Sequence, residues 1–162
     1  MAKRDENVMR IDVVPDTLVQ LLNSEEYHDE RERSKGALSV RYEEKESTEA
    51  RHVFEVHTET YAKGITGVDR SKREQQYQRY VWDLKARKGS WTFHSSHGER
   101  VQVWGHIRVE EAGDGSRMTN DFNIDVRIPL VGGQVEKKVM KEVKKGWSQL
   151  ETTVREFVKK RS

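Results

Sequence analysis

The sequence predicts an α+β fold: a curved antiparallel sheet of about seven strands around one long C-terminal helix, with two short helices after the first strand. One observation is the stretch from Gly132 to about Lys160, where apolar residues recur in steps of three and four. Another is apolar–polar alternation through residues 37–128, broken by short turns, which is typical of antiparallel strands with one covered face. The C-terminal helix would span ~42 Å at about 1.5 Å per residue, so it is long enough to cover that face.

The N-terminus leads into the first strand and the first short helix. Residues 1–7 are mostly charged and show no apolar pattern, so we expect a flexible N-terminus. Val8–Val14 alternates between apolar and polar residues and predicts a half-buried strand. Pro15 ends this strand and is well placed in the first turn of a short helix, because its fixed φ suits that position.

A second, more polar helix follows at once. Ser24 is its expected N-cap, since a serine hydroxyl can accept a hydrogen bond from an amide of the first turn. Residues 25–35 are almost all charged, so we expect an exposed helix with Tyr27 as its anchor. Gly36 is expected to end it.

Six further strands are marked by alternation and bounded by glycine, proline or polar turns. The pattern places them at residues 37–43, 51–61, 74–84, 91–93, 100–111 and 117–128. The connection at residues 62–72 is expected to be a loop with the apolar Ile65 at its tip. Pro129 ends the last strand.

Composition limits the classes of protein that the chain can be. With 162 residues, the simplest interpretation is a single domain over 1–162. The 30 basic and 28 acidic residues form a mixed surface, which predicts no binding of nucleic acid. The chain has no cysteine, and no apolar run approaches the ~20 residues of a transmembrane segment. We therefore expect a cytoplasmic protein.

Three segments resemble a known superfamily. They are the strand that leads into Pro15, the run Ile128-Pro129-Leu130-Val131-Gly132-Gly133-Gln134-Val135-Glu136-Lys137, and the run Gly146-Trp147-Ser148-Gln149-Leu150. Together they resemble the START-like, or SRPBCC, superfamily with its helix-grip fold, and the second run is similar to an uncharacterised bacterial family within it. The resemblance implies a cavity between sheet and helix that holds lipids, sterols, polyketides or hormones. A minority of members catalyse cyclisation or dehydration in this cavity, so the resemblance also allows an enzyme of that type.

Aromatic and apolar residues on the predicted inner faces are candidates to line such a cavity. The candidate ligand-binding residues are Phe54, Val56, Tyr80, Trp82, Trp91, Phe93, Met118, Asn120, Phe122, Met140, Val143 and Trp147. The alternative is that the apolar members simply fill the core, since aromatic side chains bury large areas. For Asn120 the alternatives are a hydrogen bond to backbone or water and a polar contact to a ligand, because a buried unpaired amide costs about 1–3 kcal/mol.

The sequence offers no catalytic residue and predicts no cofactor and no metal site. The histidines do not share one face of a predicted strand, and His94 and His106 are expected to face solvent. No phosphate-binding glycine motif is present. Trp104 lies on a predicted outer face and is a candidate contact for a partner or a homodimer.

Three functions follow from this pattern. The leading hypothesis is a non-enzymatic protein that binds or carries an apolar small molecule or lipid between sheet and helix. The alternatives are a cyclase or dehydratase that uses the same cavity, and a protein-interaction module. The enzyme would need an inward ionisable residue with a displaced pKa. Because the pattern shows none, the sequence favours a binding protein over an enzyme.

Overall fold

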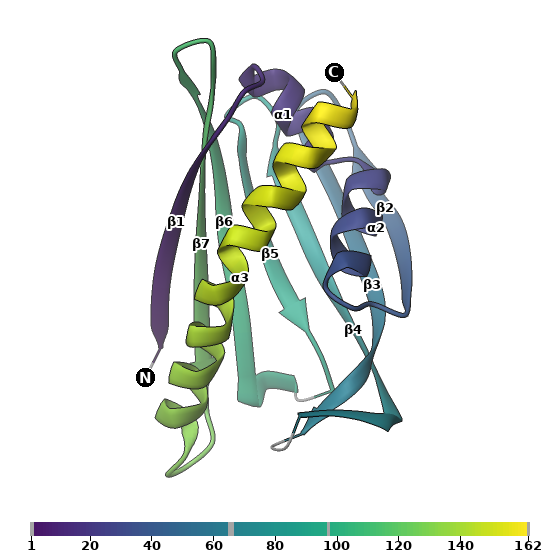
Figure 1. Ribbon diagram of the computed structural model, residues 1–162, viewed down its shortest axis with the longest axis vertical. Coiled ribbons are helices and arrows are strands. Elements are labelled where there is room, and N and C mark those ends of the chain that lie inside the picture. The colour runs from purple at the N-terminus through teal and green to yellow at the C-terminus, as the bar shows by residue number, and fades with distance from the viewer. Residues whose placement is uncertain (1, 65–66, 97, 162) are drawn as a thin grey trace.

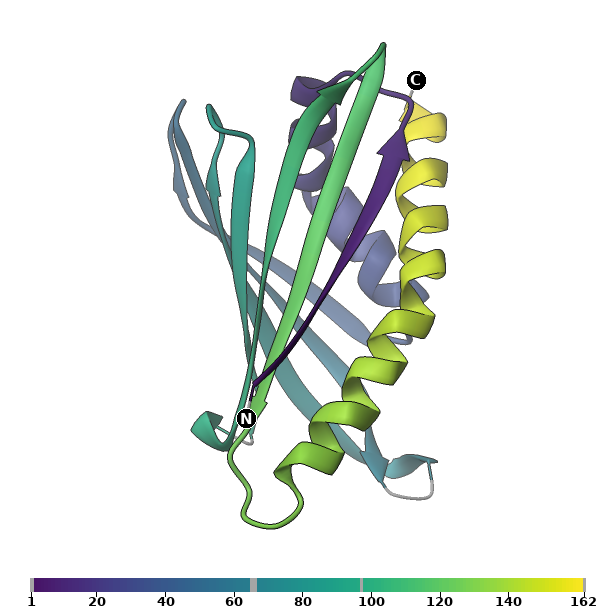
Figure 2. The same ribbon diagram turned by 90° about the vertical axis from the view of Figure 1, so that its left-hand side faces the viewer.

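The computed structural model describes residues 2–64, 67–96 and 98–161, and it confirms the predicted helix-grip fold (Figure 1). A single seven-stranded antiparallel sheet has the strand order β1-β7-β6-β5-β4-β3-β2. The helix α3 crosses one face of this sheet diagonally, and α1 and α2 lie on the same face (Figures 1 and 2). In chain order the elements are β1 (Lys3–Ile11), α1 (Pro15–Leu22), α2 (Glu25–Ser34), β2 (Ser39–Ser47), β3 (Arg51–Gly64), β4 (Gly67–Asp83), β5 (Lys88–His94), the short 3₁₀ helix η1 (Gly98–Arg100), β6 (Val101–Ala112), β7 (Gly115–Val126) and α3 (Gly132–Arg161).

The first strand begins earlier than its sequence pattern indicates. Residues 3–7, expected to form a flexible N-terminus, pair with residues 120–124 of β7, and the strand ends at Ile11 rather than Val14. The expectation was wrong because these residues are held by backbone hydrogen bonds at the sheet edge, which need no apolar alternation.

The hairpin between β3 and β4 is also longer than expected. Most of residues 62–72, expected to form a loop, belong to the two strands, with Ala62 opposite Asp69 and Lys63 opposite Val68. Ile65, expected at the tip, lies outside the described residues. The last strand stops sooner than expected: β7 ends at Val126, so Ile128 lies outside the strand and is exposed.

The second helix is buried more deeply than its charge suggests. Ser24 caps it as expected, since its hydroxyl accepts a hydrogen bond from the amide of Tyr27 at 3.3 Å. Tyr27 is buried as predicted, but His28 and Glu32 are buried as well. The inward face therefore carries polar groups into the interior.

The core of the described residues divides into two clusters. The larger joins α1, α2 and the end of α3 to one half of the sheet. Its most buried members include Ile11, Leu18, Phe54, Trp82 and Phe157. The smaller cluster joins the start of α3 to the end of β7. It comprises Ile124, Val126 and Met140, with Val101, Val103, Phe122, Val135 and Val139 packed against it.

Glycines allow tryptophan rings to lie flat on the inner face of the sheet. Trp91 lies over Gly105, its cross-strand neighbour on β6. A Cβ atom at Gly105 would be 2.6 Å from ring atoms of Trp91 and 2.5 Å from the backbone oxygen of Asp121. The absence of a side chain at this position therefore keeps the indole close to the sheet.

We expect Gly105→Ala to lower the free energy of unfolding by about 1–3 kcal/mol, because the new methyl group overlaps both the indole and a backbone oxygen. Urea unfolding followed by circular dichroism measures the change. Gly146→Ala in α3 is the matched control. Nothing lies within 4 Å of a Cβ there, so it should raise stability by up to about 1 kcal/mol. Equal effects of the two substitutions would contradict this account of the sheet floor.

Candidate functional site

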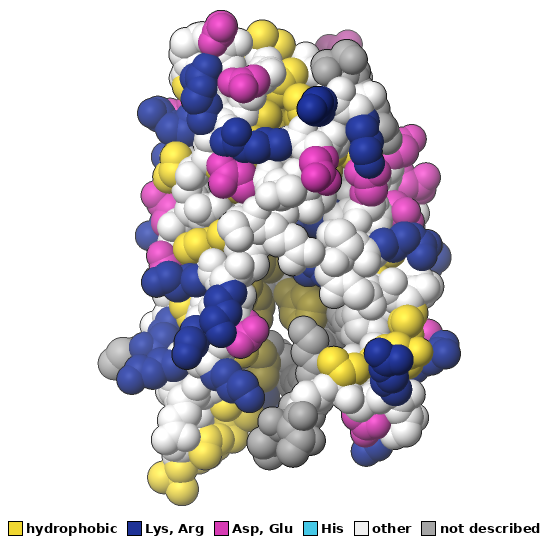
Figure 3. All heavy atoms as spheres, viewed as in Figure 1, with side chains coloured by type: hydrophobic (Ala, Val, Ile, Leu, Met, Phe, Trp, Pro, Cys, Tyr) yellow, Lys and Arg dark blue, Asp and Glu magenta, His cyan; other side chains and the backbone are white. Residues whose placement is uncertain are grey.

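The helix α3 does not close the inner face of the sheet along its whole length. Figure 3 shows a hollow between the first half of α3 and the β3–β4 hairpin, with hydrophobic side chains on its floor. In Figure 1 the same region lies over β5 and its neighbours. The hollow lies between the larger and the smaller core cluster.

Strand register shows which residues form the floor on this side of the sheet. Tyr80 is opposite Trp91, Trp91 is opposite Gly105, and Gly105 is opposite Phe122. The rings of Trp91 and Phe122 are 6.0 Å apart and tilted by 49°. Both residues are only half-buried. Trp91 on β5 and Phe122 on β7 thus leave part of their aromatic surface uncovered on the inner face of the sheet.

The structure divides the twelve residues predicted to bind a ligand. Five of them, Phe54, Val56, Tyr80, Trp82 and Met118, are buried in the larger cluster, and Met140 is buried in the smaller one. A second group keeps partial exposure on the inner face or on the apolar stripe of α3: Trp91, Phe93, Phe122, Val143 and Trp147. Asn120 is 9% exposed. Contact with a ligand stays a prediction for all of them, and the second group is the better placed.

One wall of the hollow is polar, and sequence reasoning missed it. On β4 the amide Nε2 of Gln76 donates to Thr58 Oγ1 at 3.0 Å and to Thr60 Oγ1 at 3.2 Å, both on β3. Further along β4, the hydroxyl of Tyr80 donates a hydrogen bond to Gln78 Oε1 at 2.8 Å. The alternation that places Tyr80 inward also places Gln78 and Gln76 inward, so a signal was present.

The polar wall continues onto α2 through Arg31. Its Nη1 donates to the hydroxyl of Tyr80 at 3.2 Å. Burial raises the pKa of Tyr80, so the phenol stays protonated at neutral pH. A guanidinium is always charged in proteins, and this wall therefore has a positive end.

Several buried nitrogen atoms have no hydrogen-bond partner in the part of the chain that the structure describes. They are Arg31 Nε, Asn120 Nδ2, Trp82 Nε1 and His28 Nδ1. The first three can only donate. Asn120 was predicted to face inward, and its amide nitrogen has no acceptor among the described residues, which leaves water or a ligand as its partner.

His28 lies beside this wall and is neutral at physiological pH. Its Nε2 is 2.7 Å from the carbonyl oxygen of Leu22, so Nε2 carries the proton. Burial, together with the charge of Arg31, lowers the pKa of His28 to about 3. Although burial opposes its ionisation, Lys35 and Arg31 hold the pKa of Glu32 below its usual value.

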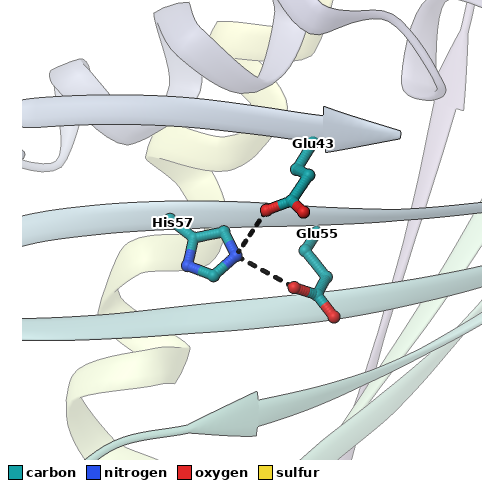
Figure 4. Close-up of side chains that lie close together, drawn as sticks. All are labelled: Glu43, Glu55 and His57. Atoms are coloured by element: carbon teal, nitrogen blue, oxygen red, sulfur yellow. Dashed lines mark hydrogen bonds and ion pairs between the residues drawn. The ribbon is translucent and has the colours of Figure 1, made fainter. Parts of the chain in front are cut away.

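A cluster on β2 and β3 brings three potential metal ligands together, two carboxylates and one imidazole (Figure 4). One oxygen or nitrogen atom from each of Glu43, Glu55 and His57 falls within 4.8 Å of the others. However, Arg79 is 3.0 Å from Glu55 and Lys45 is paired with Glu43. Because protein cations already neutralise both carboxylates, we assign this cluster to an ion network and not to a metal centre.

The remaining sequence candidates lie away from the hollow. His94 and His106 are exposed, as expected. Trp104 is half-buried, and its carbonyl oxygen accepts a hydrogen bond from Asn123 Nδ2 at 3.2 Å. Within the described residues, no helix is long and apolar enough to cross a membrane.

Comparison with known proteins identifies a family and a fold. The family model DUF2505, described as a protein of unknown function, matches residues 6–158. None of the curated protein sequences matches the chain at a significant level.

Solved structures share the whole architecture at low identity. The protein TTHA0849 from Thermus thermophilus is 19% identical with a TM-score of 0.62, over 100% of this chain and 99% of that one. Ara h 8.0201 is 17% identical with a TM-score of 0.63, over 98% of each chain. The Zhui aromatase/cyclase from Streptomyces sp. R1128 is 12% identical with a TM-score of 0.63, over 99% and 96%. These likenesses confirm the predicted helix-grip fold.

Proposed function

The chain belongs to the DUF2505 family of proteins of unknown function, and we propose that it binds and carries an apolar small molecule or lipid in the hollow between its sheet and α3. In this proposal it acts as a single domain in the cytoplasm and does not transform its ligand.

The observation that carries the proposal is the division of the core into two clusters with half-exposed aromatic rings between them. Aromatic surface left uncovered in a concave site gains about 25 cal/mol for each Å² that a ligand removes from water. Trp91, Phe93 and Phe122 present such surface side by side on the inner face of the sheet. A compound that fits the hollow would thus replace missing core contacts.

The polar wall favours a second candidate, a cyclase or dehydratase that uses the same hollow. Tyr80 is an ionisable group at an inner position, with a raised pKa and hydrogen bonds to Arg31 and Gln78. A neighbour of the same fold is an aromatase/cyclase. In this alternative the phenol would donate a hydrogen bond to a substrate carbonyl. Carriage remains our preferred proposal, because Tyr80 is 2% exposed and its proton is already donated to Gln78.

Binding of a neutral fluorescent probe tests the proposal. N-phenyl-1-naphthylamine should bind the purified chain with increased emission. Val143→Trp, which adds bulk on the apolar stripe of α3, should weaken binding about tenfold, because overpacking of this kind costs about 1–3 kcal/mol and 1.4 kcal/mol is tenfold. Glu142→Trp, on the exposed side of the same turn, is the matched control and should leave the affinity unchanged.

Two results would contradict carriage. One is a wild-type chain that gives no probe signal. The other is an equal loss in both tryptophan variants, which would place the probe on the surface of the helix. Mass spectrometry of an organic extract of the purified protein adds an independent measurement, since a carrier is expected to retain an apolar compound.

A further inference from the structure

Arg31 lies on the inner side of α2, although it stands in a run of charged residues. It follows Tyr27 by four positions and His28 by three, and both of those residues are buried. Residues at these spacings share one face of a helix. Arg31 therefore extends along the buried face, whereas its neighbour Arg33 is exposed.

The guanidinium of Arg31 has little to bind in the described part of the chain. Its one hydrogen bond is from Nη1 to the hydroxyl of Tyr80 at 3.2 Å, and its buried Nε has no acceptor. No carboxylate among the described residues forms an ion pair with it. By contrast, Arg33 Nε donates to both carboxylate oxygens of Asp29 at 3.1 Å, and Arg79 pairs with Glu55 at 3.0 Å.

The position of Arg31 relative to the aromatic floor suggests what it could bind. Tyr80 accepts from Arg31 and donates to Gln78, so these three side chains form one chain of hydrogen bonds. On the sheet, Tyr80 is opposite Trp91 and Gln78 is opposite Phe93. A charged group thus adjoins the half-exposed rings of the hollow.

We infer that the hollow takes an amphipathic ligand whose anionic group, a carboxylate or a phosphate, binds Arg31 while its apolar part covers Trp91 and Phe93. The inference rests on the proposed function and adds the ligand class. A planar guanidinium binds carboxylates and phosphates through paired hydrogen bonds, and such bonds are about twice as strong as neutral ones. An anion would also give this half-buried guanidinium a direct ion pair, since the nearby carboxylate of Glu32 is paired with Lys35 at 3.4 Å and acts on Arg31 only through space.

Three ligands with the same alkyl chain test this inference: dodecanol, dodecanoate and dodecyl phosphate. Each displaces N-phenyl-1-naphthylamine from the full chain, and the displacement gives its affinity. At least one of the two anions should bind the wild-type protein about tenfold or more tightly than the alcohol. The tighter of the two anions identifies which group the site prefers.

Arg31→Met removes the positive charge but keeps an unbranched apolar side chain, so it tests the charge apart from the packing. It should reduce the affinity for the preferred anion about tenfold and leave dodecanol unchanged. Arg33→Met, on the exposed side of α2, is the control and should change neither. The comparison of the three ligands on the wild-type protein needs no variant, so it decides the matter even if Arg31→Met does not fold.

The outcomes separate this inference from the proposal beneath it. If dodecanol binds and neither anion is preferred, the anion site is wrong and carriage stands. Equal weakening of all three ligands by Arg31→Met would show that Arg31 only supports Tyr80, which also overturns the inference. If none of the three ligands binds and the probe gives no signal, the proposed function itself is wrong.

Discussion

Phe157→Ala is expected to lower the free energy of unfolding by about 3–5 kcal/mol, the usual range for removal of a buried phenylalanine ring. Phe157 is 1% exposed and belongs to the larger core cluster. Its ring meets that of Tyr27 edge-on, with centroids 5.5 Å apart. The substitution therefore removes an aromatic contact between the end of α3 and α2 and leaves a cavity in the larger core cluster.

Phe93→Ala is the matched control for this effect. Phe93 is half-buried at the hollow, so its ring already lacks part of its contacts, and the loss of stability should be clearly smaller. Urea unfolding of the two variants and the wild type gives both values. If Phe93→Ala costs as much as Phe157→Ala, the inner face beside Phe93 is closely packed and the account of the hollow fails.

Stability is expected to fall as the pH is lowered from about 6.5 toward 3, with His28 as a main cause. Its pKa is about 3 in the folded chain because of burial and the charge of Arg31, and about 6.5 when unfolded. Between these values the unfolded state binds a proton that the folded state does not. The free energy of unfolding therefore falls by up to about 1.4 kcal/mol for each unit by which the pH is lowered, and this loss is complete near pH 3.

His28→Gln isolates this contribution. A glutamine amide can still donate to the carbonyl oxygen of Leu22, but it does not titrate in this range. The free energy of unfolding of the variant should depend less steeply on pH between 6.5 and 4. The wild type should take up as much as one proton more than the variant on unfolding. Depressed carboxylates, such as Glu55, destabilise both proteins at acidic pH and cancel in the comparison. Parallel pH profiles would show that His28 is accessible to protons when folded.

The fold could be predicted because its signals are local. Strand residues such as Met118 and Ile124 alternate, α3 repeats every three to four positions, and the change of period marks the boundary at Pro129. The strand at residues 3–7 was missed because its side chains carry no alternation. Its pairing partner, residues 120–124, is more than a hundred positions away.

The site could be predicted only in part. Alternation placed Trp82 and Trp91 on the inner face, but it could not tell which ring would be covered. Trp82 is buried in the main cluster and Trp91 is half-buried. This difference depends on how the helices pack on the sheet, which a strand's own alternation does not encode. Arg31 and Gln78 were missed because such residues usually face solvent.

The two core clusters have a consequence for how a molecule could enter. Glu136 fixes the start of α3, since its carboxylate accepts a hydrogen bond from the amide of Val126 at 2.9 Å, and Phe157 fixes the other end. Between them lies Gly146, the residue type that costs an α-helix most after proline. We therefore expect any bending of α3 that admits a ligand to occur near Gly146, between the two anchored ends of the helix.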